Sequence, residues 1–190
     1  MKDYIKSYIL ESLTIKENII NDTQILNNIE KAVELIINAY KNNKKVLVAG
    51  NGGSAADAQH FSAELVSKFL NDRPALNAIA LTTNTSIITA VGNDYSHEYI
   101  FARQVQAYGN AGDVYLAIST SGNSKNIIKS IEEAKKNGLK VIGLTGMKNS
   151  EMDSLCDLVI KVPSEKTPII QEAHIMIEHL ICALVEKYLG

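Results

Sequence analysis

The chain has 190 residues, enough for one domain of ordinary size with a substantial buried core. Hydrophobic residues make up 46% of it and charged residues 21%, which is the composition of a water-soluble globular protein. The formal net charge is −2 and the lysines are scattered, which argues against nucleic acid as a partner because such binding needs a basic face.

The first forty-odd residues are predicted to form helices. One set of apolar residues recurs at helical spacing: Ile25, Ile29, Val33, Ile36 and Tyr40. The apolar face is widened by Leu26, Leu35 and Ile37. A helix that is apolar over so wide an arc must pack against something, and a partner subunit would provide such a surface. Residues 1–43 are therefore expected to take part in oligomer packing.

The rest of the chain is predicted to alternate between strands and helices. Strands are expected at 44–50, 77–81, 114–119, 139–146 and 157–162. Helices are expected at about 54–69, 86–91, 97–108, 125–137 and 168–188, with a loop at 92–95. The strands are almost uniformly apolar, which indicates a parallel sheet covered by helices on both faces. We therefore expect one doubly wound α/β domain over residues 1–190, with a helical N-terminal extension.

Three features bear on where the protein works. No apolar run approaches the roughly 20 residues that span a bilayer. The N-terminal sequence MKDYIKSYILESL carries charges throughout and lacks the apolar core of a signal peptide. The two cysteines, Cys156 and Cys182, are too few for a disulfide framework and are expected to be buried free thiols. A cytoplasmic protein with no membrane partner fits these features.

Two turns that follow strands are rich in Gly, Ser and Thr. The first is Gly50-Asn-Gly-Gly-Ser54, and the second is Ser119-Thr-Ser-Gly-Asn-Ser124. In open α/β sheets ligands bind at such turns, and the second turn opens a helix whose N-terminus can hold a phosphate. Neither turn matches a nucleotide-triphosphate P-loop or a dinucleotide fingerprint. For each turn the alternative is a tight turn with an N-cap serine.

Polar residues beside these turns are further candidates. His60 and Glu64 lie four residues apart, so they project from one face of the helix that the first turn opens. This pair suits metal binding or proton transfer, and an ordinary surface pair is the alternative. Asp94, in the segment VGNDY, could orient sugar hydroxyls or stabilise a turn.

The last helix carries a second cluster of polar residues: Gln171, Glu172, His174, Glu178 and His179. Gln171 and His179 lie about 80° apart around the helix and about 12 Å apart along it. That is a long reach for two ligands of one ion, unless the side chains lean together or come from different subunits. His174 with Glu178 is a competing pair, and spacing alone does not reject it.

Four segments resemble a known family. ISTSGNSKNIIKSIEEAKKNGLKVIGLTG, residues 118–146, resembles the phosphosugar-binding signature of sugar isomerase (SIS) domains. NGGSAADAQHFSAEL, AVGNDYSHEYIF and QEAHIMIEH are similar to segments of the phosphoheptose isomerase family. The resemblance covers essentially the whole chain. It implies a flavodoxin-like fold, a homotetramer with active sites at subunit interfaces, and a cytoplasmic isomerase.

The resemblance also implies a reaction and a site. The family converts D-sedoheptulose 7-phosphate to D-glycero-D-manno-heptose 7-phosphate, toward nucleotide-activated heptose for bacterial surface polysaccharide. One zinc ion per subunit would be held by His60, Glu64, Gln171 and His179, with Glu64 as general base and His179 as general acid. The phosphate would be held by Ser119, Thr120, Ser121 and Ser124. The sugar would be contacted by Asn51, Gly52, Gly53, Ser54, Asn93, Asp94, Glu64 and Gln171.

One departure and one rival function accompany the resemblance. Lys166 and Ile169 flank Thr167-Pro168, where family members often carry an acidic residue and an arginine. The departure leaves the metal set intact, but a sugar or subunit contact of the family at these two positions is not carried over to this chain. The rival is a non-catalytic SIS protein that acts as a scaffold or regulator, of which one type binds a replication-initiation protein. A pure scaffold has no need to retain all four residues of the metal set.

Overall fold

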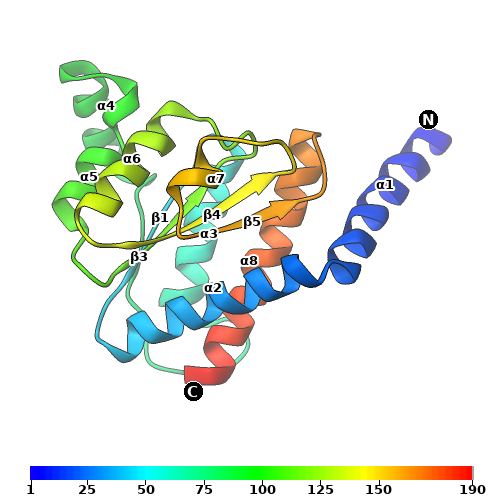
Figure 1. Ribbon diagram of the computed structural model, residues 1–190, viewed down its shortest axis with the longest axis horizontal. Coiled ribbons are helices and arrows are strands. Elements are labelled where there is room, and N and C mark those ends of the chain that lie inside the picture. Colours follow the sequence, from blue (N-terminus) through cyan, green and yellow to red (C-terminus); the bar gives the residue numbers. More distant parts are fainter. Residues whose placement is uncertain (190) are drawn as a thin grey trace.

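The computed structural model describes residues 1–189, so Gly190 of the predicted domain lies outside the described residues (Figure 1). Its centre is a parallel sheet of β1 (Val46–Ala49), β2 (Ala78–Ala80), β3 (Val114–Ile118), β4 (Lys140–Gly146) and β5 (Leu158–Val162). The strand order is β2-β1-β3-β4-β5. This is the doubly wound order in which the chain changes direction across the sheet between β1 and β3.

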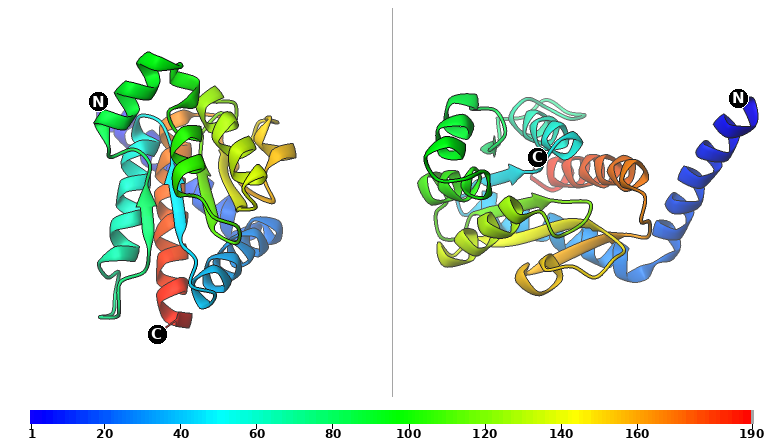
Figure 2. Two further views of the ribbon diagram at one scale, coloured as in Figure 1. Left: turned by 90° about the vertical axis from the view of Figure 1, so that its left-hand side faces the viewer. Right: turned by 90° about the horizontal axis from the view of Figure 1, so that it is seen from above.

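Helices cover both faces of the sheet, as the apolar strands predict (Figure 2). One face packs against α2 (Thr23–Lys41), α3 (Gly53–Val66) and α8 (Thr167–Leu189). The other face packs against α5 (Ala102–Tyr108), α6 (Lys125–Lys136) and α7 (Met152–Leu155), with α4 (Thr85–Asp94) and the 3₁₀ helix η1 (His97–Tyr99) at its edge. The side chains of β1 alternate accordingly: Val46 and Val48 enter the first layer, and Leu47 and Ala49 enter the second.

The N-terminal extension consists of two helices, because Asp22 ends α1 (Lys2–Asn21) and caps α2. Asp22 has extended backbone angles, and its carboxylate accepts hydrogen bonds from the N–H groups of Gln24 and Ile25. In both figures α1 projects away from the rest of the molecule. Only Ser12 and Ile19 of α1 are buried, so this helix has an unpaired surface along most of its length.

The predicted loop at 92–95 is wrong. Gly92, Asn93 and Asp94 are the last three residues of α4. The side chain of Asn84 caps this helix by accepting from the N–H of Ile87, and the N–H of Tyr95 still bonds to the carbonyl of Val91. A single glycine inside a helix costs only about 1 kcal/mol, so these hydrogen bonds carry the helix past it.

Two other helix predictions need correction. The predicted helix at 97–108 divides into η1 and α5, because Ile100 and Phe101 turn into the core between them. The short helix α7 was not predicted, since four residues are too few to show a periodicity.

Helix α8 matches its predicted bounds within one residue at each end, but it is more apolar than predicted. It has 23 residues, and an 18-residue window within it reaches a mean hydropathy of 1.3, which by length and composition would suffice to cross a membrane. Half of that window is buried inside the protein, where α8 packs against α2, α3 and the sheet. Such burial is typical of the core helix of a globular protein.

Candidate active site

The glycine-rich loop after β1 is shaped by close contacts. Gly52 has a φ of +58°, a left-handed conformation that favours glycine. A Cβ at Gly53 would lie 2.6 Å from Nε2 of Gln171, so the Gln171 side chain of α8 rests directly on the first residue of α3. The loop therefore brings α3 and the start of α8 into direct contact.

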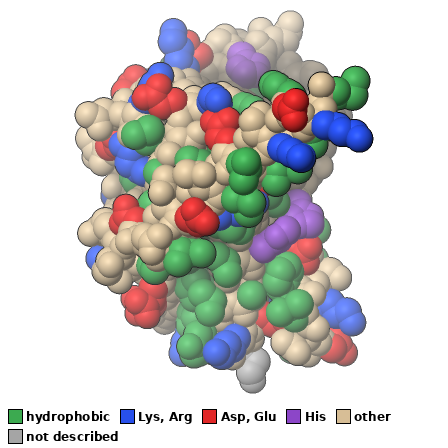
Figure 3. Space-filling model, turned by 90° about the vertical axis from the view of Figure 1, so that its right-hand side faces the viewer, with side chains coloured by type: hydrophobic (Ala, Val, Ile, Leu, Met, Phe, Trp, Pro, Cys, Tyr) green, Lys and Arg blue, Asp and Glu red, His purple; other side chains and the backbone are tan. Residues whose placement is uncertain are grey.

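Farther along the same two helices, three candidate residues come together. Nε2 of His60 lies 2.8 Å from Nε2 of His179 and 3.2 Å from Oε1 of Glu64. One donor atom from each of the three side chains lies within 4.8 Å of the other two. The His60 side chain is 44% exposed, so the cluster is open to solvent. Figure 3 shows histidine side chains at the surface beside hydrophobic ones.

These three side chains suit a zinc ion. Imidazole nitrogens and a carboxylate oxygen are common zinc ligands. Two nitrogen ligands at the usual distance on a tetrahedral zinc lie about 3.3 Å apart, so His60 and His179 need only a small outward movement. Gln171 stands eight residues before His179 on α8, and in residues 1–189 no hydrogen bond joins it to the cluster. The cluster thus supplies three of the four predicted ligands directly.

The competing pair, His174 and Glu178, faces the protein interior instead. Both side chains are buried, and Nε2 of His174 donates to the backbone carbonyl of Thr145 at 3.2 Å. Burial lowers the pKa of His174 to about 4, so its ring is neutral at pH 7. Burial, reinforced by the nearby carboxyl of Asp57, raises the pKa of Glu178 to about 9. A neutral imidazole and a protonated carboxyl in the core do not form a site for a solvent-borne ion.

Two residues beside the cluster were not predicted. Asp57 precedes His60 by one helical turn on α3; burial raises its pKa and the charge of His60 opposes this shift. Residues three positions apart on a helix lie on the same face, so the position of Asp57 beside His60 could have been predicted from the sequence. Phe69 packs its ring against the imidazole of His179, with 5.6 Å between ring centroids.

Glu186 of α8 holds the segment that carries Phe69. Its carboxylate accepts hydrogen bonds from the backbone N–H groups of Phe69, Leu70 and Asn71. Burial opposes ionisation of Glu186, but these N–H donors outweigh it and lower its pKa to about 2. The carboxylate therefore remains ionised at neutral pH and fixes the aromatic neighbour of His179.

The second predicted turn joins β3 to α6 and gathers three hydroxyls. Oγ of Ser119 lies 3.0 Å from Oγ of Ser124 and 3.5 Å from Oγ of Ser121. Ser124 is the N-cap of α6, yet its side chain makes no capping hydrogen bond. The hydroxyls and the first N–H groups of a 12-residue helix thus converge at the place where the sequence predicts a phosphate.

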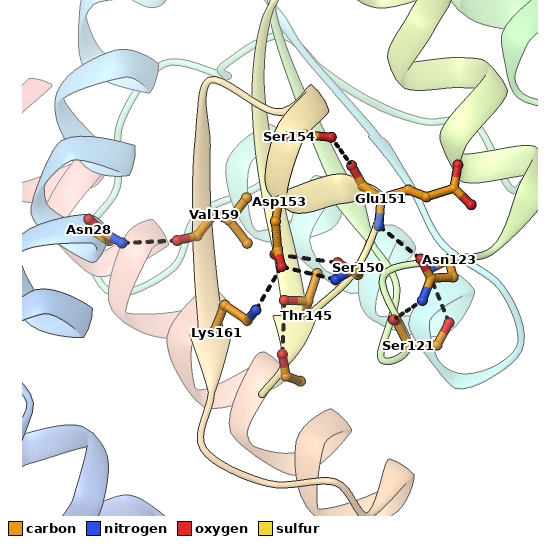
Figure 4. Close-up of polar contacts among 11 residues, drawn as sticks. Asn28, Ser121, Asn123, Thr145, Ser150, Glu151, Asp153, Ser154, Val159 and Lys161 are labelled. Carbon is orange, nitrogen blue, oxygen red and sulfur yellow. Dashed lines mark hydrogen bonds and ion pairs between the residues drawn. The ribbon is translucent and has the colours of Figure 1, made fainter. Parts of the chain in front are cut away.

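The loop that follows β4 supports this turn from outside (Figure 4). The side-chain oxygen of Asn123 accepts from the N–H of Glu151, and its amide nitrogen donates to the carbonyl of Ser121. The same outer loop is held by Asp153, whose carboxylate binds Lys161 at 2.8 Å. The shape of the turn is therefore fixed before any ligand arrives.

Gly122→Ala is expected to destabilise the protein by roughly 1–3 kcal/mol. Gly122 has a φ of +66°, and a Cβ there would collide with the side chain of Ser150. Urea unfolding measures the cost. Gly92→Ala is the matched control, because its new methyl group would meet only Ile100, at 3.9 Å, within a helix. Equal stability of the two variants would contradict the strained geometry of the turn.

The predicted sugar contacts Asn93 and Asp94 lie outside the two loops, on α4. They are exposed at the end of α4, where the amide of Asn93 donates to the carboxylate of Asp94 at 2.9 Å. Within residues 1–189 no hydrogen bond or ion pair joins either one to the other candidate residues. An ion pair between Glu98 of η1 and Lys125 of α6, at 3.4 Å, places this region beside the phosphate turn.

The two departures from the family pattern have structural roles. Nζ of Lys166 binds the carboxylate of Glu11 on α1 at 2.8 Å. Ile169 is buried in the core. Together with the ion pair between Lys16 and Glu172, Lys166 ties α1 to the start of α8.

Comparisons with known proteins agree with this architecture. A protein-family model described as SIS domain matches residues 7–146. The phosphoheptose isomerase of Aneurinibacillus thermoaerophilus is 56% identical over 187 residues, which cover 98% of this chain and 94% of the relative. The chain belongs to the phosphoheptose isomerase family of SIS domain proteins.

Further phosphoheptose isomerases match along the full length. Phosphoheptose isomerase 2 of Campylobacter jejuni is 55% identical, covering 100% of this chain and 94% of the relative. The solved structure of a phosphoheptose isomerase from Francisella tularensis superimposes with a TM-score of 0.93 at 40% identity and covers 97% of each chain. The family resemblance and the fold expected from the sequence are thereby confirmed.

Proposed function

We propose that the protein is an aldose–ketose isomerase that converts D-sedoheptulose 7-phosphate to D-glycero-D-manno-heptose 7-phosphate by proton transfer through an ene-diol. The observation that carries this proposal is the convergence of His60, Glu64 and His179 in a chain whose full-length relatives are phosphoheptose isomerases. The product would lead toward nucleotide-activated heptose for bacterial surface polysaccharide.

The exchange of a ketose and an aldose requires a base and an acid. A proton leaves the hydroxyl-bearing carbon beside the carbonyl, and a proton then returns to the neighbouring carbon. Glu64 serves as the base, and His179 donates a proton to the carbonyl oxygen, so that negative charge does not build up there. When the ene-diol collapses, Glu64 returns its proton to the former carbonyl carbon and His179 takes the proton of the neighbouring hydroxyl, which becomes the aldehyde. Their proximity to His60 supports a shared reaction centre.

The donor set also supports a bound zinc ion, held by His60, Glu64 and His179 and completed by Gln171. Zinc bound there would supply polarisation of the sugar oxygens. Gln171 of the same chain reaches the ion if its side chain moves off Gly53. Otherwise the fourth ligand is the Gln171 of a partner subunit. Within this set Glu64 accepts a proton through the carboxylate oxygen that zinc leaves free, and His179 donates through the ring nitrogen that does not face the ion.

The substrate is held at its far end by the phosphate turn. Ser119, Thr120, Ser121 and Ser124 bind the phosphate with the N-terminus of α6. The sugar chain is contacted by Asn51, Gly52, Gly53, Ser54, Asn93, Asp94 and Gln171. Binding energy gained at the phosphate orients the reacting end, which lowers the barrier without touching the reacting atoms.

The active form is a homotetramer with sites at subunit interfaces. Large hydrophobic side chains are exposed along α1: Tyr4, Ile5, Tyr8, Ile9, Leu10, Leu13 and Ile20. A groove of about 610 Å³ between α2 and α8 is lined by further apolar residues, among them Leu26, Val33 and Leu184. Exposed apolar patches of this kind mark protein–protein contacts. Contributions from a second subunit would also supply Asn93 and Asp94.

The protein works in the cytoplasm, which agrees with its two free thiols. Cys156 is half-buried, whereas it was expected to be buried.

The scaffold alternative gains no support, because the metal and proton-handling residues are present and the full-length relatives are isomerases. Incubating the purified protein with sedoheptulose 7-phosphate and following the aldose product by NMR tests the proposal. Absence of product from an intact oligomer, in the presence of zinc, would contradict it.

A further inference from the structure

The two glycine- and serine-rich turns lie on opposite sides of the point where the strand order reverses. The turn after β1 leads into α3 on one face of the sheet, and the turn after β3 leads into α6 on the other face. Because these helices leave neighbouring strands on opposite faces, the turns flank the topological switch point of the sheet, where ligands of such sheets bind. The backbone pairing of β1 with β3 ends at Ala49 and Ala117, so it does not set the distance between the two turns that follow.

One side-chain pair joins the two turns. Nδ2 of Asn51 donates to Oδ1 of Asn126 at 2.9 Å, and Nδ2 of Asn126 donates to Oδ1 of Asn51 at 2.8 Å. Asn126 is the second residue of α6 and is 3% exposed, whereas Asn51 is half-buried in the first turn. The two amides thus form a closed ring of two hydrogen bonds between residues 75 positions apart.

This pair couples the geometry of both turns. The backbone carbonyl of Asn51 accepts from the N–H of Ser54 at 3.0 Å, so Asn51 also sets the start of α3. Asn126 follows Ser124 in the first turn of α6, the helix that begins at the phosphate turn. Separating the turns would leave a buried amide without partners, which costs about 1–3 kcal/mol.

We propose that Asn126 is a positioning residue, which holds the Asn51 side chain and the glycine-rich turn at a fixed distance from the phosphate turn. This inference rests on the proposed function, in which a sugar phosphate occupies both turns. Asn126 acts through Asn51, because Nδ2 and Oδ1 of its amide both bond to the Asn51 side chain. Nothing in the sequence signature marked Asn126, since its partner is distant along the chain.

The test compares Asn126→Ala, Asn51→Ala and the double variant. The matched control is Ser130→Ala, one turn farther along α6, which removes a buried hydroxyl that bonds to Tyr115 at 2.6 Å. The measurements are kcat and KM for sedoheptulose 7-phosphate, the Kd of inorganic phosphate, and Tm. If Asn126→Ala does not fold, Asn126→Ser takes its place in every comparison.

Asn126→Ala is expected to lower kcat/KM about 10- to 100-fold, mainly through KM, since small misplacements of binding groups have effects of this size. Ser130→Ala should stay within about threefold of the wild type while losing a similar amount of Tm. The double variant should be no worse than Asn51→Ala, because both changes remove one shared interaction.

Three results would overturn the inference. They are a kcat/KM for Asn126→Ala within about threefold of the wild type, an equal loss in Ser130→Ala, and losses that multiply in the double variant. If the wild type itself does not turn over the sugar, the proposed function fails. The phosphate Kd still tests Asn126 in that case, since the variant should then bind phosphate at least about fivefold more weakly.

Discussion

Glu64→Gln is expected to lower kcat by about 1,000-fold while leaving sugar phosphate binding measurable. General acid–base catalysis contributes about 10²- to 10⁴-fold, and glutamine keeps the shape of glutamate without its ability to accept a proton. The phosphate turn, with Ser119 and Ser124, is untouched by the change. The loss should therefore fall on turnover and not on the binding of the far end of the substrate.

Steady-state kinetics give kcat, and titration calorimetry gives the Kd of sedoheptulose 7-phosphate for the inactive variant. Glu132→Gln is the matched control, because Glu132 is an exposed glutamate on α6 that pairs with Lys129 and lies outside the cluster. A kcat for Glu64→Gln close to that of Glu132→Gln would remove Glu64 from the role of base.

The second large effect concerns the metal. His60→Ala and His179→Ala are each expected to weaken zinc binding at least about 100-fold. Loss of residues that merely orient metal ligands already costs 10- to 100-fold, so loss of a ligand should cost no less. Removing either imidazole leaves a carboxylate and a single nitrogen in the cluster.

Zinc affinity is measured by competition with a chromogenic chelator, and zinc content by elemental analysis. His97→Ala is the control, since His97 is exposed on η1 and lies outside the cluster. Zinc retained at wild-type affinity by both His60→Ala and His179→Ala would show that the ion binds elsewhere.

Much of the fold could be predicted because its signals are local. Uniformly apolar segments such as VLVA (46–49) and VYLAI (114–118) predicted buried parallel strands, and both strands are fully buried. Asn137-Gly138 ends α6 as expected, with Gly138 at a φ of +77°. The errors have two causes. Gly92 lies within α4 because the helix's own cap and backbone hydrogen bonds outweigh the cost of a glycine, whereas the burial of Ile100 and Phe101 divides a predicted helix.

The candidate site was less accessible to sequence reasoning. Spacing placed His60 beside Glu64 but did not choose between His179 and the pair His174–Glu178, because both fit one helix. The packing of α8 against α3 makes the choice: it turns His179 toward His60 and buries Glu178. The family resemblance favoured His179 for the same role. The hydrogen-bonded amides of Asn51 and Asn126 left no local signal at all.

The most direct test of the account is turnover of sedoheptulose 7-phosphate by the purified protein, followed by NMR after chelation and again after zinc is added back. The account predicts that chelation abolishes formation of the aldose and that zinc restores it. Turnover that is indifferent to chelation would contradict a zinc ion at His60, Glu64 and His179. No turnover under either condition, from an intact oligomer, would contradict the isomerase itself.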